Sequence, residues 1–199
     1  MDADLLLTKG GPRAFQSDDT RRQEVCRDLI AAAYQQGNFL LSSGEESGFY
    51  FDKYLFETRP TILRRLASLM AELVPPDIDR LVGCELGGVP LTVAMALETG
   101  IPYVVIRGTA SNRAPDRVVG EIHADEKVLI VEDVVATGTR AAEAVAHIRG
   151  LGVEVAGVLA VMDRQQGGAE HILDAGSTFH ALLDLSDIES ASGPMSSKE

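Results

Sequence analysis

The second part of the chain alternates between apolar runs and segments with helical periodicity, and no other feature constrains the fold as strongly. From Asp79 onward, each apolar run has the length of a strand and is followed by a glycine-containing turn or a polar stretch. Strands that read as nearly continuous apolar runs are typical of parallel sheets, because helices cover both faces of such sheets. The sequence therefore predicts an α/β fold with a central, mainly parallel sheet flanked by helices. We expect strands at 79–85, 101–108, 127–133, 153–163 and 180–188, and helices at 90–100, 140–149 and 168–175.

The first part of the chain has a different rhythm. Apolar residues recur at helical spacing over 18–36, and Gly37 provides a stop signal, so we expect a helix there. The stretch "NFLLSSGEESGFYFDKYLF" predicts two short strands around a turn at 43–46. Pro60 lies where a helix can begin without the missing N–H group, and apolar residues through Leu73 give that helix a buried face.

These patterns divide the 199 residues into four parts. We expect a flexible N-terminal arm at 1–17, an N-terminal helix and small hood at 18–58 (together called the hood below), a core domain at 59–188, and a disordered tail rich in serine, glycine and proline at 189–199. A chain of this length is sufficient for one α/β domain with a sizeable hydrophobic core.

Composition excludes several classes of function. The net charge of −12 argues against a nucleic-acid surface, which would show a basic stripe. No apolar run approaches the ~20 residues that span a bilayer, and the N-terminus lacks the pattern of a signal peptide, so we expect no membrane association. Cys26 and Cys84 lie far apart and match no metal-ligand spacing, which fits a reducing cytoplasm. Because the net charge also opposes anionic ligands, backbone dipoles, arginines or a metal ion would have to overcome it locally.

One strand–turn–helix segment carries the most specific signal. In "VLIVEDVVATGTRAAEAV" (128–145), an apolar strand ends with Glu132 and Asp133 and is followed by a Thr137-Gly138-Thr139 turn into a helix. Such a turn directs unpaired N–H groups, the positive end of the helix dipole and two hydroxyl groups at one point, which predicts a phosphate cradle. Because no lysine follows Gly138, the spacing is not that of a P-loop.

The two acids add a second recognition element to this segment. Carboxylates next to a phosphate cradle can accept hydrogen bonds from vicinal sugar hydroxyls, so the segment predicts a site for a ribose 5-phosphate. The alternative interpretation is a helix capped by Thr137 or Thr139 beside two solvated acids.

Two further strand ends carry unusual residues. They are Glu85-Leu86-Gly87-Gly88 and Arg107-Gly108. Ligands of open parallel sheets bind beyond the carboxyl ends of the strands, so we expect these residues to converge on the same site as Glu132 and Asp133.

The chain resembles a known family, the type I phosphoribosyltransferases. "VLIVEDVVATGT" resembles their signature for phosphoribosyl pyrophosphate (PRPP), and "GCELGGVPL" resembles their pyrophosphate loop. Three more segments are similar to the orotate branch of the family: "FLLSSGEESGFYFDKYLFE" to its hood, "VMDRQQGG" to its Asp-Arg-Gln segment and "LLDLSDI" to its closing strand. The resemblance covers about residues 37–188 and implies the type I phosphoribosyltransferase fold with a small N-terminal hood.

The resemblance also implies a reaction. It is the transfer of the 5-phosphoribosyl group from PRPP to orotate, giving orotidine 5′-monophosphate and pyrophosphate, with Mg²⁺ as cofactor and a homodimer as the functional unit. Glu132 and Asp133 would stabilise positive charge on the ribose, and with Arg107 they are the expected catalytic residues. Mg²⁺ would arrive with PRPP, and Asp133 is the candidate protein contact for it. The expected PRPP-binding residues are Glu85, Leu86, Gly87, Gly88, Arg107, Arg113, Glu132, Asp133, Val134, Val135, Ala136, Thr137, Gly138, Thr139 and Arg140. The expected base-binding residues are Ser42, Ser43, Gly44, Tyr50, Phe51, Ala136 and Arg164.

The loop after the Arg107 strand departs from the family pattern. Family members carry two lysines and then His or Tyr in this loop, whereas this chain has Gly108, Ser111 and Arg113 at those positions. Each cation missing from a pyrophosphate contact forfeits ~1.5–3 kcal/mol of interaction. Arg113 and Arg117 are the cations that could compensate.

This degenerate loop keeps two alternatives open. One is a catalytically weak or inactive relative that binds PRPP or a nucleotide as a sensor. The other is a phosphoribosyltransferase for a different base, which is favoured by Ala136 at a position where family members have a base-contacting threonine.

Overall fold

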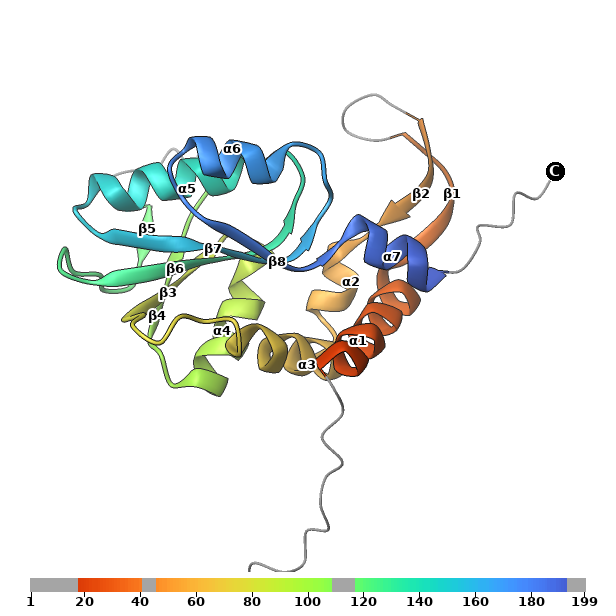
Figure 1. The fold of residues 1–199 in the computed structure, drawn as a ribbon, viewed down its shortest axis with the longest axis horizontal. Helices are drawn as coiled ribbons and strands as arrows, with labels where there is room; N and C mark the ends of the chain where they lie inside the picture. Colours follow the sequence, from red (N-terminus) through yellow and green to blue (C-terminus); the bar gives the residue numbers. More distant parts are fainter. Residues whose placement is uncertain (1–17, 41–45, 109–116, 193–199) are drawn as a thin grey trace, which may run out of the picture.

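A computed structural model describes residues 18–40, 46–108 and 117–192 of the chain (Figure 1). Its centre is a six-stranded sheet with strand order β5-β4-β3-β6-β7-β8. Among the described strands of this sheet, only the two-residue β5 at the edge pairs antiparallel, and the others run parallel. The predicted α/β fold with a mainly parallel sheet is therefore confirmed. The strands are β3 (Arg80–Cys84), β4 (Tyr103–Ile106), β5 (Val118–Val119), β6 (Lys127–Val135), β7 (Glu154–Asp163) and β8 (Phe179–Asp184).

Each face of the sheet has its own buried cluster, because alternate residues of a strand point to opposite faces. On β6, Leu129 and Val131 belong to one cluster, and Val128 and Ile130 belong to the other. Two helices cover each face (Figure 1). The first face is covered by α3 (Pro60–Ala71) and α4 (Gly88–Thr99), and the second by α5 (Thr139–Gly150) and α6 (Gly168–Asp174).

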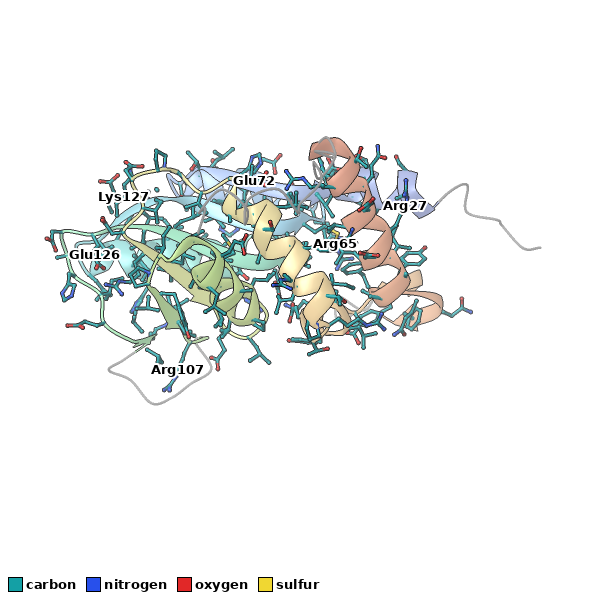
Figure 2. All side chains as sticks on the ribbon, turned by 90° about the horizontal axis from the view of Figure 1, so that it is seen from below. Arg27, Arg65, Glu72, Arg107, Glu126 and Lys127 are labelled. Carbon is teal, nitrogen blue, oxygen red and sulfur yellow. The ribbon has the colours of Figure 1, made fainter. Side chains whose placement is uncertain are left out.

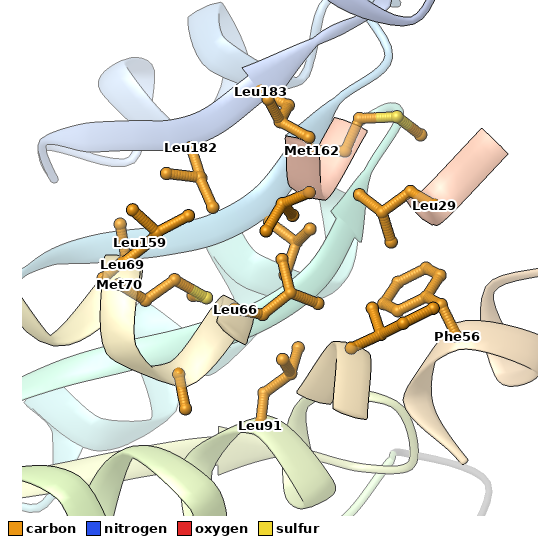
Figure 3. Close-up of a cluster of buried hydrophobic side chains, with 14 of the residues drawn as sticks. Leu29, Phe56, Leu66, Leu69, Met70, Leu91, Leu159, Met162, Leu182 and Leu183 are labelled. Carbon is orange, nitrogen blue, oxygen red and sulfur yellow. The ribbon is translucent and has the colours of Figure 1, made fainter. Parts of the chain in front are cut away.

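The hood forms the other end of the molecule. It consists of α1 (Asp18–Ala33), the antiparallel strands β1 (Tyr34–Leu40) and β2 (Glu46–Phe51), and the short helix α2 (Lys53–Glu57). The last helix, α7 (Leu185–Ser192), lies beside α1 (Figure 1). Leu29 and Phe56 of the hood meet Leu66 of α3 and Leu91 of α4 in one buried cluster (Figure 3). The hood and the core domain therefore share a hydrophobic interior.

Exposed ion pairs also connect the two parts. Arg65 of α3 contacts both Glu24 and Asp28 of α1, and Arg21 of α1 contacts Glu72 just beyond α3 (Arg65 and Glu72 are labelled in Figure 2). Exposed pairs of this kind contribute ~0–1 kcal/mol each, so the shared interior supplies most of the attachment.

Several predicted boundaries differ in the structure, and at two of them the type of element changes. The first helix ends at Ala33 rather than at residue 36, because Tyr34 and its two successors pair with β2 as an extended strand. The predicted closing strand at 180–188 ends at Asp184, and α7 follows it. Residues 189–192, which we expected in a disordered tail, are therefore helical.

The apolar face predicted for the helix after Pro60 continues two residues beyond the end of that helix. Leu66, Leu69 and Met70 are buried, but α3 ends at Ala71, and Leu73 beyond it is exposed. No helix in the described part of the chain is both long enough and apolar enough to cross a membrane.

Candidate active site

The carboxyl ends of β3, β4 and β6 lie side by side at one edge of the sheet. β3 pairs in parallel with both neighbours, so that Cys84 is opposite Ile106 of β4, and Gly83 is opposite Val131 of β6. The loop 85–88, Arg107 and the acids of β6 therefore leave the sheet from adjacent positions, as the sequence analysis expects.

The turn formed by residues 137–139, here called the phosphate turn, has a backbone that only glycine accommodates. Gly138 has φ of 74°, in the left-handed region, and an added Cβ would lie 2.5 Å from the carbonyl oxygen of Gly168 in α6. Within the described ranges, no side chain caps the N-terminus of α5 with a hydrogen bond. Its first N–H groups therefore remain available to a ligand, contrary to the interpretation of the turn as a threonine cap.

The phosphate turn borders a cavity of about 210 Å³, here called the cradle cavity. The Thr137 and Thr139 side chains are exposed, with their hydroxyl oxygens 3.2 Å apart. His171 of α6 contacts the phosphate turn, and its Nδ1 atom lies 3.0 Å from the Thr137 carbonyl oxygen. The cavity is lined by Glu132, Val134, Val135, Ala136, Thr137, Gly138, Thr139, Arg140 and Ala141.

Glu132 is the acid that faces the cradle cavity. Its side chain is 3% exposed, and Oε2 has no hydrogen-bond partner in the described part of the chain. The nearest cation is the Arg140 Nη2 atom, 3.5 Å from Oε2. Burial, followed by the charge of Asp133, raises the pKa of Glu132 to about 7. A buried acceptor without a donor is costly, so this oxygen is poised for a donor or a cation that enters with a ligand.

The side chain of Asp133 points to the opposite face of β6 from that of Glu132, and Asp133 is fully buried. Its Oδ2 lies 2.5 Å from Nζ of Lys53 in α2, and its Oδ1 accepts a hydrogen bond from the N–H of Val134 at 2.5 Å. It is not among the residues that line the cradle cavity. The two acids, which the sequence analysis assigns to one sugar, therefore project from opposite faces of β6.

A second cavity, of about 190 Å³, lies beside the first and is here called the arginine cavity. Arg107 after β4, Arg117 before β5 and Arg140 of α5 all line it, and Arg140 also lines the cradle cavity. Arg140 Nη2 donates to the Glu85 carbonyl oxygen at 3.1 Å, which ties α5 to the loop after β3. Arg107 is exposed at the surface (Figure 2). The remaining lining residues are Cys84, Glu85, Ile106, Gly108, Glu143 and Ala144.

Glycines 87 and 88 in the loop after β3 allow close approach of the backbone. A Cβ on Gly88 would lie 2.5 Å from the Val131 carbonyl oxygen, and a Cβ on Gly87 would lie 1.6 Å from Oδ2 of Asp133. Leu86, which precedes the two glycines, is exposed. The loop can therefore pack against β6 only because both residues lack side chains.

The predicted base-binding residues occupy different surroundings. Tyr50 is 42% exposed, with its ring centroid 5.6 Å from that of Phe39. Phe51 packs against the buried ring of Phe56 at 5.9 Å, so its main contact is with the interior. Arg164 follows β7, and its N–H donates to the Val135 carbonyl oxygen at 2.8 Å, which places it next to the cradle cavity. Four predicted site residues, Ser42, Ser43, Gly44 and Arg113, lie outside the described residues.

Sequence reasoning missed Lys53 and Glu57 of the hood. Glu57 is 3% exposed, and its Oε1 has no hydrogen-bond partner in the described ranges. Burial, followed by the proximity of Asp133, raises the pKa of the Glu57 carboxyl group. The available signal was the i, i+4 spacing of a lysine and a glutamate in a chain with few lysines. That spacing does not identify a partner on a distant strand.

Comparison with known proteins gives consistent matches over most of the chain. Residues 56–191 match the family described as "Phosphoribosyl transferase domain". The chain is 41% identical to an orotate phosphoribosyltransferase of Halobacterium salinarum over 167 residues, which cover 81% of this chain and 95% of the relative. It is 34% identical to an orotate phosphoribosyltransferase of Methanocella arvoryzae, over 85% of this chain and 97% of the relative.

Solved structures give the same result. The orotate phosphoribosyltransferase of Mycobacterium tuberculosis in complex with inorganic phosphate matches with a TM-score of 0.76 and 29% identity, over 85% of this chain and 99% of that chain. The same enzyme in complex with PRPP matches with a TM-score of 0.73 and 29% identity, with the same coverage.

Proposed function

This chain belongs to the phosphoribosyl transferase family, and we propose that it is an orotate phosphoribosyltransferase. It transfers the 5-phosphoribosyl group from PRPP to orotate and releases pyrophosphate. The observation that carries this proposal is the cradle cavity, in which an uncapped helix N-terminus lies beside a buried carboxylate oxygen without a partner. A phosphate group and a sugar hydroxyl are the complements of these two features.

The 5-phosphate of PRPP binds at the phosphate turn. The free N–H groups at the start of α5 and the hydroxyls of Thr137 and Thr139 supply donors, and the helix dipole supplies a positive potential. The net charge of −12 repels an anionic ligand at long range, but these donors and the helix dipole attract the phosphate at contact distance.

Glu132 receives the ribose hydroxyls and stabilises the charge of the reaction. In the transfer, the bond from the anomeric carbon to pyrophosphate breaks, and its electron pair leaves with pyrophosphate. The ring nitrogen of the base loses its proton and supplies the electron pair for the new bond, and the departing pyrophosphate can accept that proton. Positive charge develops on the ribose in between, and a carboxylate held in a buried position stabilises it strongly.

The leaving pyrophosphate occupies the arginine cavity. Arg107, Arg117 and Arg140 present three guanidinium groups there, and each can donate two parallel hydrogen bonds to phosphate oxygens. Arg117 is the residue that replaces the lysines missing from the loop after β4. This arrangement favours a working enzyme over an inactive sensor.

Mg²⁺ fits this site as a cation held mainly by the substrate. The described part of the chain contains no cluster of three or more acidic, histidine or cysteine side chains that would form a metal cage. Glu132 offers one buried carboxylate oxygen without a partner, and Mg²⁺ is commonly bound by one or two carboxylates together with substrate oxygens and water. Asp133, our initial candidate, is engaged by Lys53, so Glu132 is the better candidate. When bound, Mg²⁺ would neutralise negative charge on the pyrophosphate.

Base recognition, assembly and location complete the proposal. Arg164 can pair with the carboxylate of orotate through a bidentate contact, and Tyr50 offers an exposed ring in the hood. We infer a cytoplasmic homodimer from the family resemblance. Sedimentation analysis tests the assembly, with an expected mass of twice the 21.3 kDa chain.

Loss of orotate absorbance tests the proposed function. The protein is mixed with PRPP, Mg²⁺ and orotate, and a parallel sample contains uracil instead of orotate. We expect orotate to disappear only when PRPP is present, and uracil to remain. Binding of PRPP without turnover at high enzyme concentration would support the sensor alternative. Turnover of uracil but not orotate would support transfer to a different base.

A further inference from the structure

We propose that Lys53 and Glu57 are positioning residues of the PRPP site, which hold the Asp133 carboxylate against the loop after β3 and so make docking of the hood part of site assembly. This inference rests on the proposed function, because it assigns a role within the same site. Neither residue lines the cradle cavity or the arginine cavity. They would act through Asp133 and not by contact with the substrate.

The first supporting observation is how the three side chains meet. Lys53 and Glu57 are four residues apart in α2, so they lie on the same side of that helix. Lys53 Nζ is 2.5 Å from Asp133 Oδ2. Asp133 and Glu57 are both buried, and the Lys53 side chain is 23% exposed. The hood therefore supplies both neighbours of an acid that belongs to the core domain.

The second observation is the position of Gly87. A Cβ at this residue would lie 1.6 Å from Oδ2 of Asp133 and 2.5 Å from Oε1 of Glu57. Both carboxylates therefore press against the backbone of the loop after β3, at the point where that loop enters α4. Any shift of the Asp133 side chain must move this loop or the hood.

The third observation is an imbalance of charge in the group. Lys53 is the only cation that the structure places in contact with Asp133 among the described residues, whereas Glu57 brings a second carboxyl group. The carboxyl oxygens of Asp133 and Glu57 both lie against the same point of the Gly87 backbone, so the two acids are close neighbours. Without Lys53, two buried carboxyl groups would face each other with no cation among the described residues to balance them.

This arrangement explains why adjacent acids serve different purposes. Glu132 keeps an Oε2 atom without a hydrogen-bond partner among the described residues and faces the cradle cavity. Asp133 is paired with Lys53 and holds the strand end, the loop after β3 and the hood together. Displacement of catalytic geometry by about 1 Å can cost on the order of a hundredfold in rate. Loss of the hood contacts should therefore alter PRPP use even though they are remote from the substrate.

Kinetics of matched variants test the inference. Lys53→Met removes the cation, Lys53→Arg keeps it, Glu57→Leu removes the polar end of the side chain, and Glu57→Gln keeps a polar end of the same size. Lys127→Met is the control, because Lys127 makes an ion pair of the same 2.5 Å length with Asp77, at the other end of β6. We expect Lys53→Met and Glu57→Leu to raise the KM and Kd for PRPP about tenfold or more and to lower kcat. The KM for orotate should change less than twofold, and Lys53→Arg and Glu57→Gln should recover most of the loss.

The result separates positioning from a merely structural role. A structural contact would lower the unfolding midpoint of Lys53→Met and Glu57→Leu while leaving the PRPP constants of the folded protein unchanged at 25 °C. That result would overturn the inference, as would equal effects from Lys127→Met. If a variant does not fold, the conservative partner at the same position supplies the PRPP constant. Titration calorimetry with PRPP needs no orotate, so a protein that binds PRPP but does not consume orotate would refute the proposed function while still testing the positioning role. A wild-type protein that binds no PRPP would overturn both.

Discussion

At the scale of single residues, the site depends on Glu132, whose buried Oε2 atom has no hydrogen-bond partner among the described residues. Burying the Glu132 carboxylate lowers the stability of the ligand-free protein, and the rest of the fold must offset this loss. We expect Glu132→Gln to unfold at a higher temperature than the wild type at pH 8, because a neutral amide is cheaper to bury than a carboxylate. The same variant should lose about a hundredfold or more in kcat/KM. Asp133→Asn is the contrasting variant, which should lose ~1–3 kcal/mol of stability because Lys53 is left without its partner. A less stable Glu132→Gln would contradict the burial argument.

The titration of Glu132 gives the ligand-free protein a pH dependence of known sign. Burial raises the pKa of Glu132 from 4.5 to about 7, so between these values the folded chain keeps a proton that the unfolded chain has lost. The stabilisation associated with that proton is present below pH 4.5 and is lost as the pH rises toward 7. We expect the free energy of unfolding to fall through this window, by up to ~1.4 kcal/mol per pH unit for one proton. Denaturant titrations at pH 5, 6 and 7 measure the slope, which should be smaller for Glu132→Gln. Equal slopes in the two proteins would exclude Glu132 as the source.

The sequence identifies both acids but not their separate surroundings. Alternation along a strand is a local property, so opposite orientations of Glu132 and Asp133 follow from β6 alone. The partner of Asp133 is 80 positions away, and no periodicity connects residues at that distance. Lys53 and Glu57 could therefore be found only after the hood was placed on the core domain.

At the scale of elements, the phosphate turn depends on the close approach of α6 to α5. Gly138→Ala should cost more than the usual penalty for a left-handed residue, because its Cβ would lie 2.5 Å from the Gly168 carbonyl oxygen. Gly100→Ala is the matched control, with φ of 75° and no atom within 4 Å of the new Cβ, and should cost only ~1–2 kcal/mol. Inorganic phosphate should raise the melting temperature of the control and not of Gly138→Ala. Equal phosphate stabilisation of the two variants would contradict the assignment of the turn.

Arg117 belongs to the short edge strand region that the sequence analysis did not predict. β5 has only two residues, too few to show a strand pattern, yet it brings Arg117 beside Arg107: the N–H of Arg107 donates to the Arg117 carbonyl oxygen at 2.7 Å. We expect Arg117→Gln to raise the KM for PRPP by roughly ten- to a hundredfold, the equivalent of ~1.5–3 kcal/mol for one charge-assisted contact. Arg149→Gln, at the opposite end of α5, should lower stability without changing that KM, because its guanidinium donates to the carbonyl oxygens of Ala175 and Gly176, away from the two cavities. A KM unchanged by Arg117→Gln would remove Arg117 from the pyrophosphate site.

The long elements and the pair of short strands in the hood were predictable from sequence, whereas β5, α7 and the start of β1 were not. Buried strands such as β6 and β7 carry continuous apolar runs, whose pattern survives in any context. The first three residues of β1, which the sequence analysis placed in the preceding helix, are extended because they pair with β2. Their composition favours neither strand nor helix. The helix α7 was not predicted either, because it packs against α1, which lies at the other end of the sequence.

At the scale of the whole molecule, the hood and the core domain behave as one packed unit. Phe56 of the hood is fully buried among residues of both parts (Figure 3). We expect Phe56→Ala to cost ~3–5 kcal/mol and to leave a single unfolding transition with a lower midpoint. Tyr103→Ala, at an exposed aromatic residue of β4, should cost no more than about 1 kcal/mol. Two separate transitions in the Phe56 variant would show that the hood folds independently, which would weaken its role in assembling the PRPP site.

The most direct test of the account is a crystal structure of the protein grown with PRPP and Mg²⁺. We predict that the 5-phosphate oxygens will lie on the N–H groups at the start of α5, with the ribose hydroxyls within hydrogen-bond distance of Glu132. The pyrophosphate should reach the guanidinium groups of Arg107, Arg117 and Arg140, and the Lys53–Asp133 ion pair should persist. A phosphate bound away from the phosphate turn, or a Glu132 side chain turned from the sugar, would contradict the account.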